Sequence, residues 1–371
     1  MNLNNFENQI RKTGFDLEYR ISRALDAAAW NVINNKYYVD DHEESIREID
    51  LVAYKVEKVR HLTLYTTLII SCKKNDSWIW GLLAKDGNPK AVNIDRWPLH
   101  IWTNDKALDF QFRQKNANKK YHEDVQHAGV VEAMRSPAAD IFAFQEMNRE
   151  TGSPQNDKSI FAAITSLMKA QAYELTALPT RKKDPAIYQF NLMSVVDTDL
   201  VRLHFSDTGV NATSVDTDHY IARYIIQKKE TFARIHFVKA EKFGHVLSDY
   251  GRLHEANCQL ASSMCDAFYL DVFADWRRTQ VFLEDFRKAV GWVLKWRVGA
   301  GLKRELDFSN LSFNDYKIPT DKLSIAVPDA DDELLVFLNN DNTVHTEISR
   351  KLKDIYRYDG NFKFDVPDIP F

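Results

Sequence analysis

Three strand-like segments that directly follow an amphipathic helix constrain the fold of this chain most. Within residues 14–30, apolar side chains such as Leu17, Ile21 and Leu25 recur at the spacing of one buried helical face. Residues 30–39, 46–54 and 62–72 are short and rich in β-branched, aromatic and aliphatic residues, which is typical of strands. This order predicts a sheet with a helix packed on it.

The rest of the chain continues the alternation of helices and strands. Apolar periodicity predicts helices over 158–177 and 278–296, and apolar runs predict strands over 188–196 and 232–238. The sequence therefore predicts a mixed α/β or α+β protein, in which helices flank a central mixed sheet. We expect a first domain at 1–255 and a C-terminal α/β accessory domain at 256–371, which would serve target recognition, oligomerisation or partner binding.

Composition and charge exclude several classes of protein. With 44% hydrophobic and 27% charged residues, the chain has the composition of a globular protein and not of a disordered one. No stretch reaches the roughly 18 apolar residues of a membrane span, and the N-terminus has no apolar signal segment, so we expect a cytoplasmic protein. The net charge of −4 means that nucleic acid could bind only through a local groove.

Common catalytic motifs are missing from the sequence. It contains no GxxxxGK[ST] loop, no GxGxxG turn and no GxSxG elbow, so nucleotide, dinucleotide and serine-hydrolase chemistry have no support. The three cysteines, Cys72, Cys258 and Cys265, match neither a disulfide framework nor the spacing of a zinc site. Cys72 lies in the middle of an apolar run, and we expect it to be a small core residue.

Charged residues set into two apolar strands are the most informative feature for function. Asp50 lies in the run REIDLVA (47–53), and Lys73 ends the run LIISCKK (68–74). A buried carboxylate is costly unless it is paired or binds a cation. If the two strands form a hairpin, Asp50 and Lys73 converge at one edge of the sheet, with Ser71 on the same face as Lys73. Glu18, beside the apolar stripe of the first helix, could point to the same edge.

Two acids and a lysine at one sheet edge suffice for phosphodiester hydrolysis. Mg²⁺ takes oxygen ligands and often needs only one or two carboxylates, with water and substrate phosphate completing its shell. A nearby ammonium can orient the attacking water or stabilise charge that builds on phosphorus. Taken singly, each residue also has a structural interpretation: Asp50 could be an acid neutralised by Arg47 or Lys73.

In these motifs the chain resembles the PD-(D/E)xK superfamily, the restriction-endonuclease-like nucleases. The resemblance covers roughly residues 14–80, and Ser77–Trp80 resembles the aromatic segment that follows the lysine in some members. It implies a restriction-endonuclease-like core and an endodeoxyribonuclease that depends on Mg²⁺ or Mn²⁺. Glu18 and Asp50 would hold the metal, Lys73 would act on the water, and Ser71 would contribute a hydroxyl or a hydrogen bond to a ligand. The implied partners are DNA and either a second copy of the chain or another protein of a bacterial restriction or defence system.

The sequence departs from the family pattern at Ser71, where an aspartate or glutamate is expected. A hydroxyl is a neutral and weaker ligand than a carboxylate, so a metal there would lose one anionic contact. Three explanations stay open. Glu18 supplies the missing charge, Glu48 or another acid does so, or the site has lost its metal and activity. In the last case the chain is a DNA-binding or assembly module with a nuclease fold.

Overall fold

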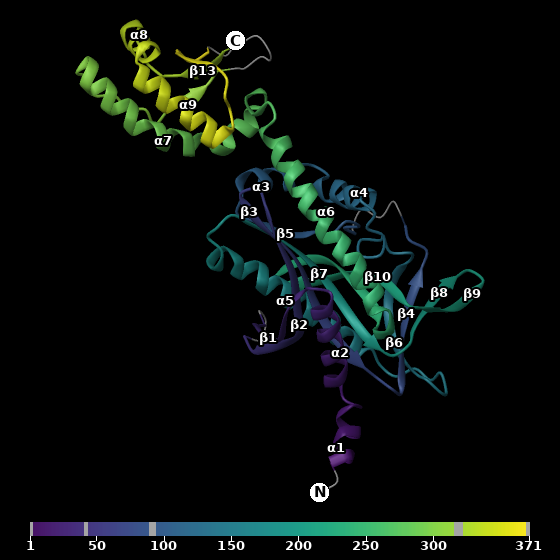
Figure 1. The fold of residues 1–371 in the computed structure, drawn as a ribbon. Coiled ribbons are helices and arrows are strands. Elements are labelled where there is room, and N and C mark those ends of the chain that lie inside the picture. The colour runs from purple at the N-terminus through teal and green to yellow at the C-terminus, as the bar shows by residue number, and fades with distance from the viewer. Residues whose placement is uncertain (1–2, 41–43, 89–93, 315–321, 369–371) are drawn as a thin grey trace. The chain divides into compact units, whose positions relative to one another are not determined.

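A computed structural model describes residues 3–40, 44–88, 94–314 and 322–368 (Figure 1). The chain forms two compact units, one of residues 1–105 and 115–261 and the other of residues 106–114 and 262–371. The division after Ala261 lies inside α6 (Phe243–Tyr269), as does the boundary predicted after residue 255. Within the described ranges, none of the helices combines the length and apolar character that crossing a bilayer requires.

A seven-stranded mixed sheet forms the centre of the first unit. Its strands run in the order β1 (Asn31–Val39), β2 (Ile46–Val59), β3 (Leu62–Lys74), β7 (Ala186–Asp197), β11 (Lys229–Lys239) and β10 (Thr217–Ile226), and β5 (His100–Thr103) pairs with β7. The first three strands are antiparallel, whereas β3 and β11 both run parallel to β7. The carboxyl ends of β3, β7 and β11 therefore lie along one edge of the sheet.

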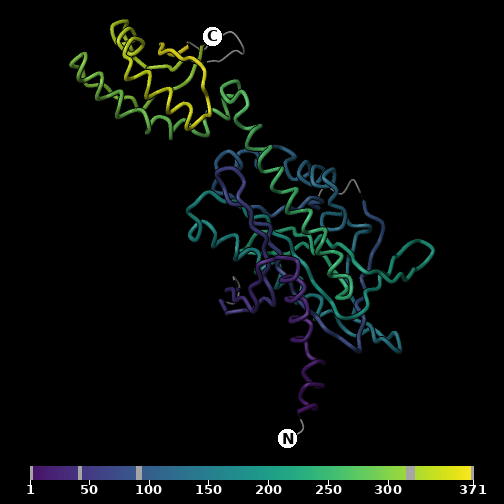
Figure 2. Tube along the Cα trace, viewed as in Figure 1, coloured from purple at the N-terminus to yellow at the C-terminus, as the bar shows by residue number. Residues whose placement is uncertain are grey.

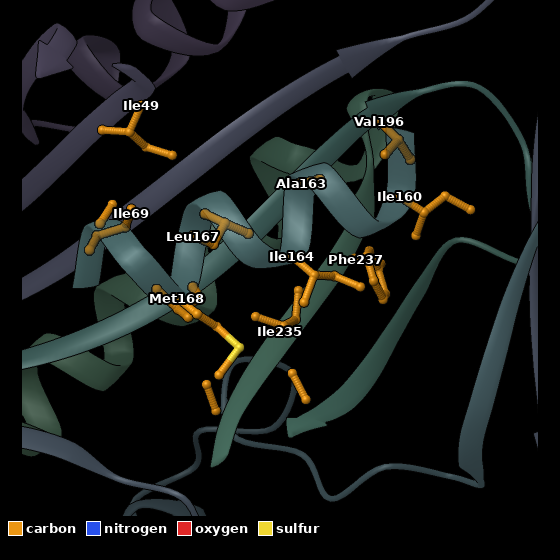
Figure 3. Close-up of a cluster of buried hydrophobic side chains, with 14 of the residues drawn as sticks. Ile49, Ile69, Ile160, Ala163, Ile164, Leu167, Met168, Val196, Ile235 and Phe237 are labelled. Atoms are coloured by element: carbon orange, nitrogen blue, oxygen red, sulfur yellow. The ribbon is translucent and has the colours of Figure 1, made fainter. Parts of the chain in front are cut away.

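Helices pack on this sheet through the apolar positions that the sequence indicates. In α2 (Gly14–Ala27), Leu17, Ile21 and Leu25 are buried. The helix ends where Ala29 adopts a left-handed φ of 57°, which directs the chain into β1. The residues of α5 (Lys158–Arg181) that Figure 3 labels, among them Ile160, Ile164 and Leu167, lie in one buried cluster with Ile69 of β3 and Phe237 of β11.

A second mixed sheet completes the first unit. Its strands run in the order β6 (Asp140–Asn148), β4 (Trp78–Lys85), β8 (Leu200–Ser206) and β9 (Gly209–Val215). Residues 81–130, for which the sequence pattern predicts no helix or strand, contain most of β4 together with β5, α3 (Lys106–Phe112) and α4 (Ala117–His127). Two further helices lie in this unit, α1 (Leu3–Ile10) and the short η1 (Ala240–Lys242).

The second unit has its own core. It contains α3, the end of α6, η2 (Val272–Ala274), α7 (Trp276–Leu302), α8 (Asp332–Asn340), α9 (Asn342–Tyr356) and a small mixed sheet of β12 (Ser312–Phe313), β13 (Leu323–Ala326) and β14 (Phe362–Asp365). In Figure 2 the green-to-yellow tube follows this path from α7 to α9. Its core includes Phe286, Leu294, Leu338 and Ile348.

The prediction of a mixed α/β protein with helices flanking mixed sheets is confirmed. The helices predicted over 14–30, 158–177 and 278–296 correspond to α2, α5 and α7, and the strands predicted over 188–196 and 232–238 correspond to β7 and β11. The predicted hairpin is also present, although its strands extend further, with a pairing that continues to Val59 and Leu62.

Candidate active site

Asp50 lies where the pairing of β2 with β3 ends. The ladder between these strands runs from Val59 opposite Leu62 to Leu51 opposite Ile70. One residue beyond the last pair, the Asp50 carboxylate accepts a hydrogen bond from the backbone N–H of Cys72, with 2.5 Å between Oδ2 and N. The carboxylate therefore takes the place of a strand carbonyl, and this charge-assisted bond fixes its position at the sheet edge.

The neighbouring strand is also irregular at this point. In the register of β1 with β2, Asn34 lies opposite Leu51 and Lys36 opposite Ile49, which places Asn35 across from Asp50. Asn35 has a left-handed φ of 51°, a conformation that asparagine tolerates better than most residues. Its side-chain amide donates a hydrogen bond to Glu48. Both strands that flank Asp50 thus interrupt their regular pairing beside it.

Lys73 lies next to Asp50, as the hairpin predicts. The Nζ of Lys73 is 3.7 Å from Oδ2 of Asp50. The two side chains keep 33% and 21% of their surface exposed, so the pair is accessible to solvent. Arg47, the other cation considered as a partner of Asp50, instead lies 3.8 Å from the carboxylate of Asp40.

Glu18 faces the same acidic group from helix α2. Partial burial raises the pKa of its carboxyl group, and the charges of Asp50 and Glu48 raise it further, whereas Lys73 acts in the opposite direction. Like charges raise the pKa of a neighbouring acid only when they are close in space. Helix α2, which carries Glu18, packs against β2 and β3, the strands that carry Asp50 and Lys73.

Ser71 brings no charge to this group. Its side chain is only 1% exposed, and its Oγ has no hydrogen-bond partner among the described residues. The same holds for Ser194, which lies opposite Ser71 in the parallel pairing of β3 with β7. An unpaired buried hydroxyl is unusual because most buried polar atoms find a partner. The position at which the resemblance to restriction-endonuclease-like nucleases predicts an acid thus holds a buried, neutral group.

The donor set at this edge fits a divalent cation that takes few protein ligands. Among the described residues, no group of three or more His, Cys, Asp and Glu side chains is arranged to hold a metal ion. Glu18 and Asp50 are two carboxylates whose repulsion a cation would relieve, and Mg²⁺ is commonly bound through one or two carboxylates. Burial raises the pKa of the Cys72 thiol well above its ordinary value.

A pocket of about 460 Å³, which the sequence analysis did not anticipate, lies along the same edge. Its lining includes Arg20 of α2 together with Asp197 and Asp199, which end or follow β7, and Lys239, which ends β11. The sequence feature from which this pocket could have been predicted is the pair of acids in the run VVDTD (195–199), directly after a buried strand. Only the parallel pairing of β3, β7 and β11 brings these residues to the edge that carries Lys73.

The acidic and basic side chains that line this pocket form ion pairs with one another. The carboxylate of Asp197 forms ion pairs with Arg20 at 2.7 Å and with Lys74 at 3.5 Å. Asp199 forms ion pairs with Lys239, at 3.0 Å, and with Arg149. The hydrogen bond from Lys239 lowers the pKa of Asp199. Basic side chains at the carboxyl ends of parallel strands are well placed to bind an anionic ligand. Such a ligand would compete with Asp197 and Asp199 for these basic side chains.

Part of the aromatic segment Ser77–Trp80, which follows Lys73, packs in the core. Trp80 is fully buried, and its ring lies edge-on against Phe237 with 5.9 Å between centroids. A tryptophan in that position cannot stack on a nucleobase. Trp78, at the start of β4, is half-buried, and Arg149 and Thr198 make hydrogen bonds beside it to the backbone of Asp76 and of Trp78 respectively.

Comparison with family models, with curated proteins and with solved structures finds no match to this chain.

Proposed function

We propose that the chain is a metal-dependent nuclease that hydrolyses phosphodiester bonds of DNA, with Mg²⁺ or Mn²⁺ as cofactor. One observation carries this proposal: Lys73 lies 3.7 Å from Asp50 at a solvent-accessible sheet edge against which α2, the helix of Glu18, packs, and the charge of Asp50 raises the pKa of Glu18. The resemblance of residues 14–80 to restriction-endonuclease-like nucleases supports the same activity, and favours a role in bacterial restriction or defence.

The residues at the edge have separate roles in this proposal. Glu18 and Asp50 would hold the cation, and the hydrogen bond from the Cys72 N–H fixes the orientation of the Asp50 carboxylate. The cation, when bound, would polarise a phosphate oxygen and lower the pKa of water. Lys73, 3.7 Å from Asp50, would orient the attacking water and stabilise the negative charge that develops on the phosphate.

A divalent cation should raise the thermal stability of the protein through Glu18. Because the pKa of Glu18 is raised in the folded state, its contribution to stability is present at low pH and is lost as pH rises through that pKa. The charge of Asp50 opposes ionisation of Glu18, and a bound cation would offset this repulsion. We expect Mg²⁺ or Mn²⁺ to raise Tm by several degrees, since about 2.7 kcal/mol is gained at a hundredfold excess over Kd.

Calorimetry of Glu18→Gln tests this cation effect. Without divalent ions at pH 7 the variant should be at least as stable as the wild type, and it should lose most of the gain in Tm that Mg²⁺ gives. Glu57→Gln removes an exposed acid of β2 and should keep the full gain. The gain should also shrink as pH falls through the raised pKa of Glu18. An equal gain in all three proteins would show that the cation binds elsewhere.

A second candidate function is a DNA-binding or assembly module without catalysis, and the neutral Ser71 favours it. Ser71→Asp tests it, because a carboxylate at a position only 1% exposed has to be desolvated. If the site holds a cation, this variant should lose roughly 5 °C in Tm without divalent ions and recover on addition of Mn²⁺.

The neutral variant Ser71→Asn is the matched control for this prediction. It carries a side chain of similar size and no charge, so any loss of stability that it shows should not respond to Mn²⁺. Recovery in Ser71→Asp alone means that position 71 adjoins a cation site that lacks one charge. Failure of Ser71→Asp to recover would favour the module without catalysis.

A further inference from the structure

Strand β7 changes its neighbour along one edge. Its other edge pairs with β3 over the whole strand. On the edge away from β3, β5 pairs with β7 up to Phe190, and β11 pairs with it from Leu192 onward. A cavity of about 20 Å³ lies at this junction, and residues of β5, β7, β11, α5 and α6 line it. A space of this size holds a single particle about as large as a water molecule.

Three buried nitrogen atoms of residues that line this cavity have no hydrogen-bond partner among the described residues. They are Nε of Arg234, Nε2 of His236 and Nε2 of Gln171. His236 and Gln171 are only 1% and 2% exposed, so water outside the protein does not reach them. Unpaired polar atoms are uncommon in protein interiors. Three of them around one cavity point to a ligand that accepts hydrogen bonds.

The ring of His236 offers this cavity an N–H group. Burial lowers the pKa of His236 to about 3, so the ring is neutral at pH 7 and carries one proton. Its Nδ1 lies 3.1 Å from the hydroxyl of Tyr250, whose pKa burial raises. This hydroxyl therefore keeps its proton and donates it in a hydrogen bond to Nδ1. The proton of the imidazole ring is then on Nε2, the atom without a partner.

Arg234 adds a positive charge that no carboxylate of the described residues neutralises in an ion pair. Burial lowers the pKa of Arg234 only to about 10, so the guanidinium is charged at pH 7. Its terminal nitrogens donate to neutral acceptors, Nδ1 of His122 at 2.8 Å and a backbone carbonyl at 3.5 Å. Asp95, the acid that acts on this charge, is exposed. By contrast, Arg202 pairs with the buried Asp218 at 2.8 Å.

We infer that this cavity binds a monatomic anion of the halide class, with chloride as the ordinary ligand. The N–H groups of Arg234, His236 and Gln171 would hold it. A halide ion accepts hydrogen bonds and also supplies the negative charge that Arg234 needs, whereas water supplies only the acceptor. The cavity is too small for a phosphate or a carboxylate group. The inference is independent of the proposed nuclease, because it involves neither the metal nor DNA.

Thermal unfolding of the full chain at pH 7 tests the inference, with chloride as the probe. Chloride replaces gluconate, an organic anion too large for the cavity, at a constant ionic strength of about 0.2 M, and Tm of the wild type should rise by about 4 °C. Arg234→Met removes the charge and keeps an unbranched side chain, so it should lose this gain. The matched control Arg223→Met removes a guanidinium of β10 that is 52% exposed, and it should keep the gain.

Crystals of the wild type grown with bromide give a second measurement that depends on no variant. Bromide is a halide with an anomalous X-ray signal, and its peak should lie in the cavity beside Arg234 and His236. An unchanged Tm of the wild type in chloride, an equal gain in Arg234→Met, or loss of the gain in Arg223→Met would overturn the inference. A cavity that holds only water in the bromide crystals would overturn it as well.

Discussion

Replacing Asp50 with alanine should lower metal-dependent DNA cleavage by about 10²-fold or more, because removal of a single group that stabilises the transition state costs that much in other enzymes. The site has only two carboxylates, and Ser71 offers no charge in place of the one removed. The alanine also leaves the N–H of Cys72 without its acceptor. Lys73→Ala should reduce cleavage to a similar extent, since it removes the ammonium next to Asp50.

Asp50→Asn separates the loss of charge from any loss of structure. Its amide oxygen can still accept the hydrogen bond from Cys72, so the variant should fold as the wild type does and cleave as poorly as Asp50→Ala. Asp76→Asn changes a carboxylate near the same edge that is 70% exposed, and it should retain full activity. Conversion of supercoiled plasmid to nicked and linear forms measures the activity of the wild type and of all four variants. Undiminished cleavage by Asp50→Asn and Lys73→Ala would exclude this site.

Phe237→Ala should destabilise the first unit by about 3–5 kcal/mol, which is the usual range for a buried phenylalanine. Phe237 is fully buried on β11 and lies against Trp80 and Phe144 at centroid distances of 5.9 and 6.0 Å. It belongs to the cluster that joins α5 to the main sheet (Figure 3). In a unit of this size the loss corresponds to roughly 10 °C in Tm.

Phe161→Ala is the matched control for the core. Phe161 lies on α5 and contacts Tyr224 edge-on, but it is 49% exposed, so its removal should cost less than about 1 kcal/mol. Differential scanning calorimetry of both variants gives the comparison. Similar losses in the two variants would mean that Phe237 does not lie at the centre of the core.

Local patterns in the sequence were sufficient to predict the helices and strands that form the main sheet. Leu17, Ile21 and Leu25 recur at a helical period, and the runs that became β2 and β3 are apolar and β-branched, so their conformation follows from short-range preferences. The region 81–130 gave no such signal because β5 and α3 are short and partly exposed. Their conformation depends on tertiary contacts, such as the pairing of β5 with β7.

The candidate site was predictable only where its residues are neighbours in the hairpin. Asp50 and Lys73 lie on adjacent strands, and Glu18 lies on the preceding helix, so pattern and spacing place them at one edge. Asp197 and Asp199 reach that edge through the parallel pairing of β3 with β7, which spans more than a hundred residues of sequence. No local pattern encodes such a pairing. The burial of Ser71 depends on the same strand.

Cleavage of supercoiled plasmid and of single-stranded DNA by the wild-type chain tests the proposed nuclease most directly. The assay compares Mg²⁺, Mn²⁺ and EDTA, with Asp50→Asn as the parallel control. We expect nicked or linear DNA with either cation, no cleavage in EDTA, and no cleavage by Asp50→Asn. Intact DNA under every condition, or cleavage that continues unchanged in EDTA, would contradict it.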